Sequence, residues 1–386
     1  MYWANRWDGR LSGAEPPHLR AEGLHFRDIM EYTKTEHTKP GVFTFTLVLT
    51  LAMPSLFAQP SDRPSDVLGL ALVGHQVSDL ERSIKFFEAI DFKVVEGPGG
   101  WTVDKELNKL GNTPGAESRT ATMRVQSSVS DVPFTLVLRQ YRGIERQDWS
   151  KLTSWNLLAS HIDLTVDGNV SVLLDKLEGL NMLVMPEVQG LPNPRRQEGF
   201  RRFAFIQDPD GLTLEYFSKP IPKPGDAPAA PMVSNSSATG ATMDRLGKQA
   251  GFNHYATNII DPQHAQDFYA KVLGGDYAPL AGRPSGAQVM LNGWFPQATT
   301  NNNLRVELGY FAVNAGKTPP PIKFQDINAN YCGFQVSNIE SAYARAKQHG
   351  AITVSEGGII DYHKGRAALI RDSDVGGYIL LWQPPR

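Results

Sequence analysis

Four residues of this chain have the types and spacing of metal ligands. Two are histidines, His161 and His254, and two are glutamates, Glu215 and Glu307. Each histidine stands near the start of an expected strand, and a glutamate follows after nearly the same interval near the end of a later strand. Imidazole nitrogens and carboxylate oxygens together suit Zn²⁺, Ni²⁺, Fe²⁺ or Mn²⁺ and leave positions open for water or substrate. The sequence therefore predicts a site for one divalent metal ion.

The elements that would position these residues repeat four times along the chain. Each unit reads as a strand, a helix with apolar residues at helical spacing, and further strands, in a βαβββ order. First strands are expected at 68–77, 161–166, 253–257 and 331–336, and later strands at 134–138, 212–217, 304–311 and 378–382. The candidate ligands occupy matching places in the second and third units only.

Strand alternation predicts which side chains share a face. His161 lies on one face with Asp163 and Thr165, and Glu215 lies on one face with Thr213. The apolar residues between them are expected to face a helix-covered core. The ligand positions thus belong to the opposite face of the sheet.

The outer two units lack such ligands. Their equivalent positions carry Leu72, Val137, Tyr331 and Leu380, none of which ordinarily binds such an ion. His75 lies on the opposite strand face from Leu72, so we expect it to pack or to form a hydrogen bond. Tyr331 and Cys332 are expected to be packed in the cavity of these outer units.

Composition sets the general class of the protein. The chain has 386 residues, enough for two domains, of which 41% are hydrophobic, and its formal net charge is −2. A nucleic-acid partner is not expected, because such proteins usually carry a large surplus of basic residues. Cys332 is the single cysteine, which excludes an internal disulfide framework.

The N-terminal part reads as an export signal. Residues 41–52 form a short uncharged apolar run, preceded by lysines and followed by a plausible cleavage site after Ala58. The run is short for a membrane span. We therefore predict a signal peptide at 30–58, a disordered or untranslated extension at 1–29, and an exported mature protein without a membrane span.

The rest of the chain divides into two predicted domains. Units one and two fall in 66–218, and units three and four fall in 251–386. Between them, residues 219–250 are rich in Pro, Ala, Ser and Gly and have no periodic apolar pattern, as expected for a linker.

Three stretches carry a resemblance to a known superfamily. They are 77–87 (VSDLERSIKFF), 208–215 (DPDGLTLE) and 268–275 (FYAKVLGG). With the ordered set of four units, they resemble the vicinal oxygen chelate superfamily, which includes glyoxalase I, extradiol dioxygenases and antibiotic-resistance proteins. The resemblance implies an α+β fold in which βαβββ modules pair to form cupped mixed β-sheets.

The resemblance also implies how the units pair. In this superfamily two units line each active cavity, and each unit contributes ligands from its strands. Pairing units one with two, and three with four, would give two incomplete sites. Pairing two with three and one with four, as in glyoxalase I, collects all four candidate ligands in one cavity. We therefore predict one functional and one degenerate cavity in a pseudo-symmetric monomer.

A glyoxalase I-like lyase or isomerase is the implied activity, on a small substrate that chelates the metal through oxygens. In such chemistry the metal polarises neighbouring oxygens and stabilises an enediolate, while a carboxylate moves the proton. By resemblance, Glu215 is that base. Arg201 and Arg202 precede the final strand of unit two and are candidates to contact an anionic substrate group. Glyoxalase I itself fits an exported protein poorly, because its thiol cosubstrate is mainly cytosolic.

Two alternatives remain open. An Fe²⁺ extradiol-type dioxygenase needs only two histidines, one carboxylate and room for O₂, so a fourth ligand at Glu307 counts against it. A non-catalytic protein that binds a small molecule in the cavity would also fit the sequence.

Overall fold

The computed structural model describes residues 64–128, 131–152, 156–157, 159–166, 170–185, 203–218, 250–279, 288–294, 305–311, 314, 316–373 and 377–385. Residues 1–29, the predicted signal peptide (30–58) and all but the last residue of the predicted linker (219–250) lie outside this set. The described residues form two mixed β-sheets with a few helices, which confirms the predicted α+β class. None of the described helices is long and apolar enough to cross a membrane.

The first sheet is built from units one and four. Unit one contributes β1 (Val67–Gln76), α1 (Leu80–Ala89), β2 (Lys93–Glu96), α2 (Lys105–Gly111), β3 (Glu117–Val125) and β4 (Phe134–Arg142). Unit four contributes β12 (Asn330–Val336), α5 (Ile339–Gln348), β13 (Ile352–Thr353), β14 (Ile360–Tyr362), β15 (Gly365–Arg371) and β16 (Tyr378–Gln383). The strand order is β13-β15-β16-β12-β1-β4-β3-β2, and β14 pairs with β15.

The second sheet is built from units two and three. Unit two contributes β5 (Ser160–Val166), α3 (Val170–Gly179), β6 (Phe203–Gln207) and β7 (Thr213–Ser218). Unit three contributes β8 (Gly251–Ile259), α4 (Pro262–Leu273), β9 (Asp276–Pro279), β10 (Gln288–Trp294) and β11 (Arg305–Phe311). The strand order is β6-β7-β5-β8-β11-β10-β9.

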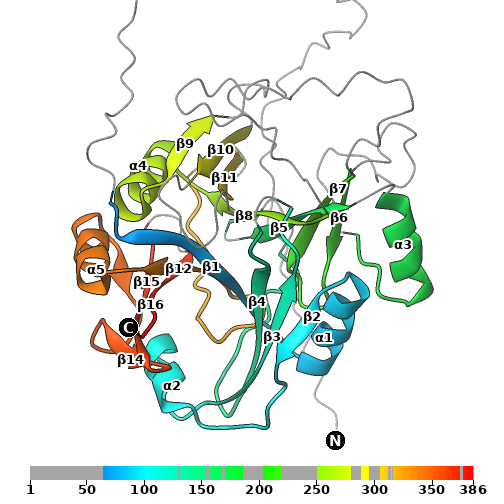
Figure 1. Cartoon of the computed structure of the whole chain (residues 1–386), viewed down its shortest axis with the longest axis horizontal. Coiled ribbons are helices and arrows are strands. Elements are labelled where there is room, and N and C mark those ends of the chain that lie inside the picture. Colours follow the sequence, from blue (N-terminus) through cyan, green and yellow to red (C-terminus); the bar gives the residue numbers. More distant parts are fainter. Residues whose placement is uncertain are drawn as a thin grey trace, which may run out of the picture. The chain divides into compact units, whose positions relative to one another are not determined.

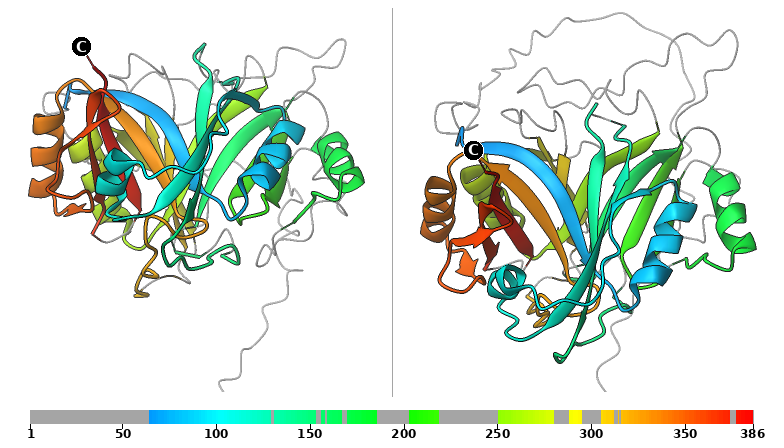
Figure 2. Two further views of the ribbon diagram at one scale, coloured as in Figure 1. Left: turned by 90° about the horizontal axis from the view of Figure 1, so that it is seen from below. Right: turned by 60° about the horizontal axis from the view of Figure 1, so that its bottom comes forward.

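This strand order confirms the crossed pairing of units. β1 runs antiparallel to β12, and β5 runs antiparallel to β8 (Figure 1). Both views of Figure 2 show β1 and β12 curving side by side through the first sheet. Unit three has the predicted βαβββ order, whereas unit one adds α2 and unit four adds β14. Unit two has two strands after its helix within the described residues.

The helix-facing sides of the sheets form the main core. On β5, Ile162 and Leu164 are buried in it, and on β7 Leu214 and Tyr216 are buried in it. Alternation along these strands places the residues between them on the opposite face, where the candidate ligands lie. Because the apolar side chains of these strands are buried on one face, the candidate ligands between them must point from the other face.

His75 anchors a turn of unit two to unit one. Its Nδ1 lies 2.6 Å from Asn330 Oδ1 and its Nε2 lies 2.9 Å from Asp208 Oδ2, in the turn between β6 and β7. In the same turn, Asp210 Oδ2 accepts a hydrogen bond of 2.9 Å from Ser83 Oγ. These partners confirm that His75 forms hydrogen bonds, and they explain this buried group of one histidine and two aspartates without a metal ion.

Candidate metal centre

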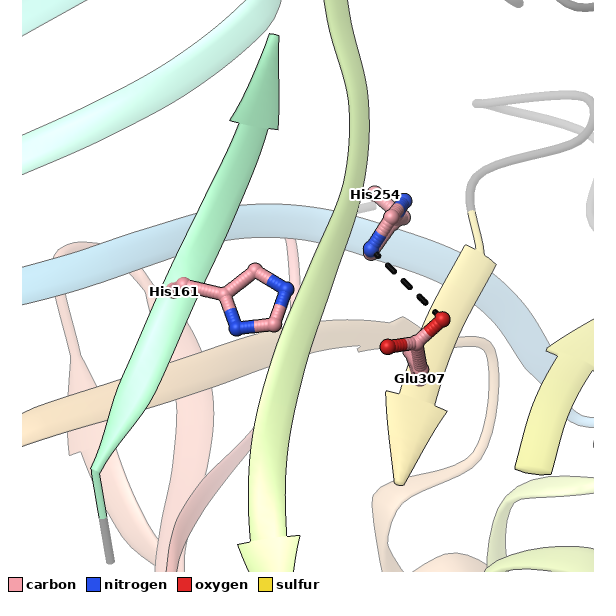
Figure 3. A group of neighbouring side chains, drawn as sticks. All are labelled: His161, His254 and Glu307. Carbon is pink, nitrogen blue, oxygen red and sulfur yellow. Dashed lines mark ion pairs between the residues drawn. The ribbon is translucent and has the colours of Figure 1, made fainter. Parts of the chain in front are cut away.

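The four candidate ligands lie on four adjacent strands of the second sheet. Glu215 is on β7, His161 on β5, His254 on β8 and Glu307 on β11, and these strands are neighbours in that order. Figure 3 shows His161, His254 and Glu307 turned toward one another from β5, β8 and β11. The structure therefore brings together the residues that the sequence singles out.

Distances within the group suit a single ion. His161 Nε2 lies 2.9 Å from Glu215 Oε2, and His254 Nε2 lies 3.9 Å from Glu307 Oε2. Ligand atoms of His161, His254 and Glu307 all lie within 4.8 Å of one another. Two atoms that bind one such ion at about 2.1 Å are about 3 to 3.5 Å apart. Ligand atoms of His161, His254 and Glu307 therefore lie near enough to share one divalent metal, and Glu215 adjoins them through His161.

A small residue lies at the centre of the group. In the strand register, Ala256 of β8 is opposite His161 on one side and opposite Glu307 on the other. Its methyl group is the side chain between these two ligands on that face. Ala256 therefore leaves space above β8 for an ion that both residues could reach.

The site concentrates buried charge. Its histidines and glutamates are only 4 to 8% exposed, and a third carboxylate, Asp163, is 1% exposed. Burying several carboxylates together is unfavourable unless cations or hydrogen bonds compensate them. The donor set therefore fits a divalent cation on charge as well as on distance.

Glu215 and Glu307 also affect the protonation of His161. Burial alone disfavours the charged imidazole, but the hydrogen bond and negative charge of Glu215, with the charge of Glu307, raise the pKa of His161 above its usual value. A metal ion would take the place of this proton, because only the neutral imidazole binds a metal.

Asp163 is the site residue whose role the sequence did not reveal. It is directly opposite His254 in one strand pair and opposite Glu215 in the other. Its Oδ2 lies 3.5 Å from His254 Nδ1, and Asn253 Oδ1 lies 3.0 Å from the same nitrogen. These acceptors favour a proton on Nδ1, which makes Nε2, 3.9 Å from Glu307 Oε2, the nitrogen that would bind a metal. Asp163 and Asn253 therefore both hold Nδ1 of His254 and fix the orientation of its ring.

The equivalent face of the first sheet is different. Tyr331 and Leu380 belong to a buried apolar cluster, Leu72 packs against it, and Val137 is buried. Among the described residues, no group of potential metal ligands lies there. Cys332 is packed as expected, but in the main core on the opposite face rather than in this cavity, as strand alternation from Tyr331 requires.

Arg201 and Arg202, the candidates for an anionic substrate group, lie outside the described residues. Their predicted contact with a substrate therefore stays a prediction.

Comparison with solved structures identifies the fold. Glyoxalase I from Zea mays is 17% identical, with a TM-score of 0.51, and the match covers 81% of this chain and 92% of that chain. A mutant of the same enzyme is 15% identical, with a TM-score of 0.50, covering 81% of this chain and 93% of that chain. No family model and no curated protein matches the sequence.

The class follows from the fold and the comparison together. The chain has the fold of the vicinal oxygen chelate superfamily, which confirms the resemblance seen in the sequence. Its units are paired in the glyoxalase I-like arrangement, with units two and three in one sheet and units one and four in the other.

Proposed function

We propose that this protein is an exported, metal-dependent enzyme of the glyoxalase I-like lyase or isomerase type. One observation carries the proposal: in the sheet of units two and three, ligand atoms of His161, His254 and Glu307 lie within 4.8 Å of one another, and Glu215 adjoins His161 on the next strand. The matched positions in the other sheet are apolar. The substrate is a small molecule with neighbouring oxygens that can chelate a metal, and the enzyme acts as a monomer, because one chain supplies all the ligands.

The residues divide into holding and reacting groups. His161, His254 and Glu307 would hold the ion, with His254 oriented by Asp163. A divalent ion bound there would act as a Lewis acid on the substrate oxygens. Glu215 is the candidate base, and its Oε2 would accept a proton from the carbon next to the substrate carbonyl.

The environment of Glu215 supports this role. The residue is 8% exposed and its carboxylate forms an ion pair with His161, so it is held in place and largely shielded from water. A proton acceptor held in a water-poor site acts on a bound substrate with little reorganisation.

The number of carboxylates disfavours a dioxygenase. A site for O₂ and a catechol needs open positions on the iron. Here Glu307 adds a second carboxylate next to His254, and Asp163 adds a third to the immediate surroundings. Proton transfer on a chelating substrate needs fewer open positions, so it fits this donor set better.

Metal analysis tests the site. We expect close to one divalent ion per wild-type chain and almost none in His161→Ala or His254→Ala. The matched control is His363→Asn, which changes an exposed histidine on the far sheet and should retain the metal. A metal content unchanged in either site variant would contradict a shared site.

Hydrogen exchange tests the reaction. In D₂O, metal-loaded protein should exchange the hydrogen next to the carbonyl of 2-hydroxy carbonyl compounds, measured by NMR. Glu215→Gln should lose the exchange while it retains part of the metal. Oxygen consumption with catechols in the absence of such exchange would instead identify a dioxygenase, and binding without either reaction would identify a non-catalytic protein.

A further inference from the structure

Three buried polar side chains lie together on the cavity face of the first sheet. Gln76 of β1 is directly opposite Arg139 of β4, and Tyr141 follows two residues later on β4. Neighbours in register and residues two apart on a strand share a face, so the three side chains point to the same side. Their exposed fractions are 0%, 4% and 2%.

Several atoms of this group lack hydrogen-bond partners. Within the described part of the chain, Gln76 Nε2 and Gln76 Oε1 are buried without one, whereas the guanidinium of Arg139 and the hydroxyl of Tyr141 interact with each other. The guanidinium also donates a hydrogen bond of 3.3 Å from Nε to Thr120 Oγ1. Most buried polar atoms in native proteins have partners. The two amide atoms of Gln76, directly opposite a buried guanidinium whose partners are hydroxyl groups, therefore indicate a bound molecule that supplies the missing partner.

The charge of Arg139 indicates what kind of molecule this is. An arginine stays protonated in proteins, and a buried charge needs a counterion. No carboxylate among the described residues forms an ion pair with Arg139; its neighbours are the tyrosines Tyr331, Tyr141 and Tyr362. Burial raises the pKa of Tyr141 to about 12, so its hydroxyl keeps its proton and can donate a hydrogen bond. The group offers donors and positive charge, which suits an anion.

The surrounding residues are arranged to bring Tyr331 over this group. A Cβ atom at Gly74 would lie 1.8 Å from Tyr331 Cε1, so the absence of a side chain at Gly74 lets this ring lie against β1. Arg139 follows Val137, the position equivalent to Glu307, by two residues. The first sheet thus has a guanidinium next to the position where the second has a candidate metal ligand.

We propose that the cavity face of the first sheet binds a small hydroxycarboxylate. Its carboxylate accepts hydrogen bonds from Arg139 Nη1 and Tyr141 Oη, and its hydroxyl pairs with the amide of Gln76. A guanidinium and a carboxylate have complementary geometry, which favours this anion over a spherical one. This site is separate from the candidate metal centre and does not depend on the reaction proposed there.

Equilibrium dialysis of the full chain with labelled glycolate tests the proposal, with acetate and chloride as competitors at constant ionic strength. We expect one glycolate per chain, displaced less well by acetate, which lacks the hydroxyl, and least by chloride. Arg139→Met should weaken glycolate binding by about 10- to 100-fold, as expected for loss of a charged hydrogen bond. Arg142→Gln, which removes an exposed charge from the same strand, should bind as the wild type does.

Thermal unfolding distinguishes a binding group from a structural one. A buried charge that only a ligand compensates destabilises the ligand-free protein, so Arg139→Met should unfold at the same or a higher temperature than the wild type without glycolate. It should also lose the rise in unfolding temperature that glycolate gives the wild type. Absence of glycolate binding, equal displacement by chloride, or marked destabilisation of Arg139→Met would each overturn the proposal.

Discussion

Replacing Asp163 by asparagine tests how the site prepares His254 for a metal ion. Asp163→Asn preserves the shape of the side chain and removes one buried negative charge. The carboxylate Oδ2 lies 3.5 Å from His254 Nδ1, on the side of the ring away from Glu307. A carboxylate at this position makes the opposite ring nitrogen a stronger metal ligand. We therefore expect weaker metal binding without loss of a ligand.

The size of the effect follows from the distances. Loss of a partner of a metal-binding histidine typically weakens metal binding by about 10- to 100-fold, or about 1.4 to 2.7 kcal/mol. Asn253 Oδ1, at 3.0 Å, remains as an acceptor for the same nitrogen. The effect of Asp163→Asn should therefore lie nearer tenfold. His254→Ala removes a ligand outright and should cost more.

The assay is a competition for Zn²⁺ between metal-free protein and a chromophoric chelator at constant pH. Asp267→Asn serves as the control, because it makes the same chemical change on the exposed side of α4. An affinity equal to that of the wild type would refute the orienting role of Asp163. A loss as large as that of His254→Ala would instead make Asp163 a direct ligand, grouped with Glu215 and His254.

Three further predictions concern the space above Ala256, the buried carboxylate of Asp210 and the pH dependence of stability. Ala256→Val should fill the space above β8 and reduce bound metal to below one tenth, whereas Ala256→Ser should retain it; metal content of folded protein decides. Asp210→Ala should lower the free energy of unfolding in urea by about 2 to 4 kcal/mol, since the side chains of Ser78, Arg82 and Ser83 all lose the buried carboxylate to which they donate. Burial lowers the pKa of His75, but the charge and hydrogen bond of Asp208 outweigh burial, so the pKa is raised in the folded protein. The ion pair therefore contributes its full stabilisation below the unfolded pKa of about 6.5, and this contribution is lost as the pH rises through the raised pKa of the folded state. The unfolding free energy should fall over that range more in the wild type than in His75→Gln, and equal slopes would contradict this.

The pairing of units could be predicted because potential metal ligands occur in only two of the four units, and because the superfamily resemblance implies that two units line each cavity. His161 and Glu215 stand out among alternating apolar residues, and the same holds for His254 and Glu307. Alternation then assigns the face of each residue from its own strand alone. Once the faces are known, a count of ligands distinguishes the crossed pairing from the sequential one.

Relations between strands of different units could not be predicted in this way. Asp163 was placed on the correct face, but its position opposite His254 depends on the register of β5 against β8, which contains an irregularity between Asp163 and Leu164. Local patterns do not encode such a register. The same holds for Gln76 and Arg139, which meet only through the pairing of β1 with β4.

Short added elements were also missed. The helix α2 has seven residues, begins after the N-cap Asp104, and buries Leu107 and Leu110 against the cavity side of the first sheet. Two apolar residues at a spacing of three are too weak a pattern to predict a helix of this length. Its stability comes from packing on the sheet, which only the folded chain provides.

The two sheets share one architecture but carry charged groups of different kinds on their cavity faces. In the second sheet, the carboxylates Glu215, Glu307 and Asp163 surround two histidines, and in the first a guanidinium, that of Arg139, lies among tyrosines. Buried charge of either sign is unfavourable without a partner. The same physical requirement therefore leads us to expect a cation at one face and an anion at the other, so that the first sheet binds a different class of molecule from the second.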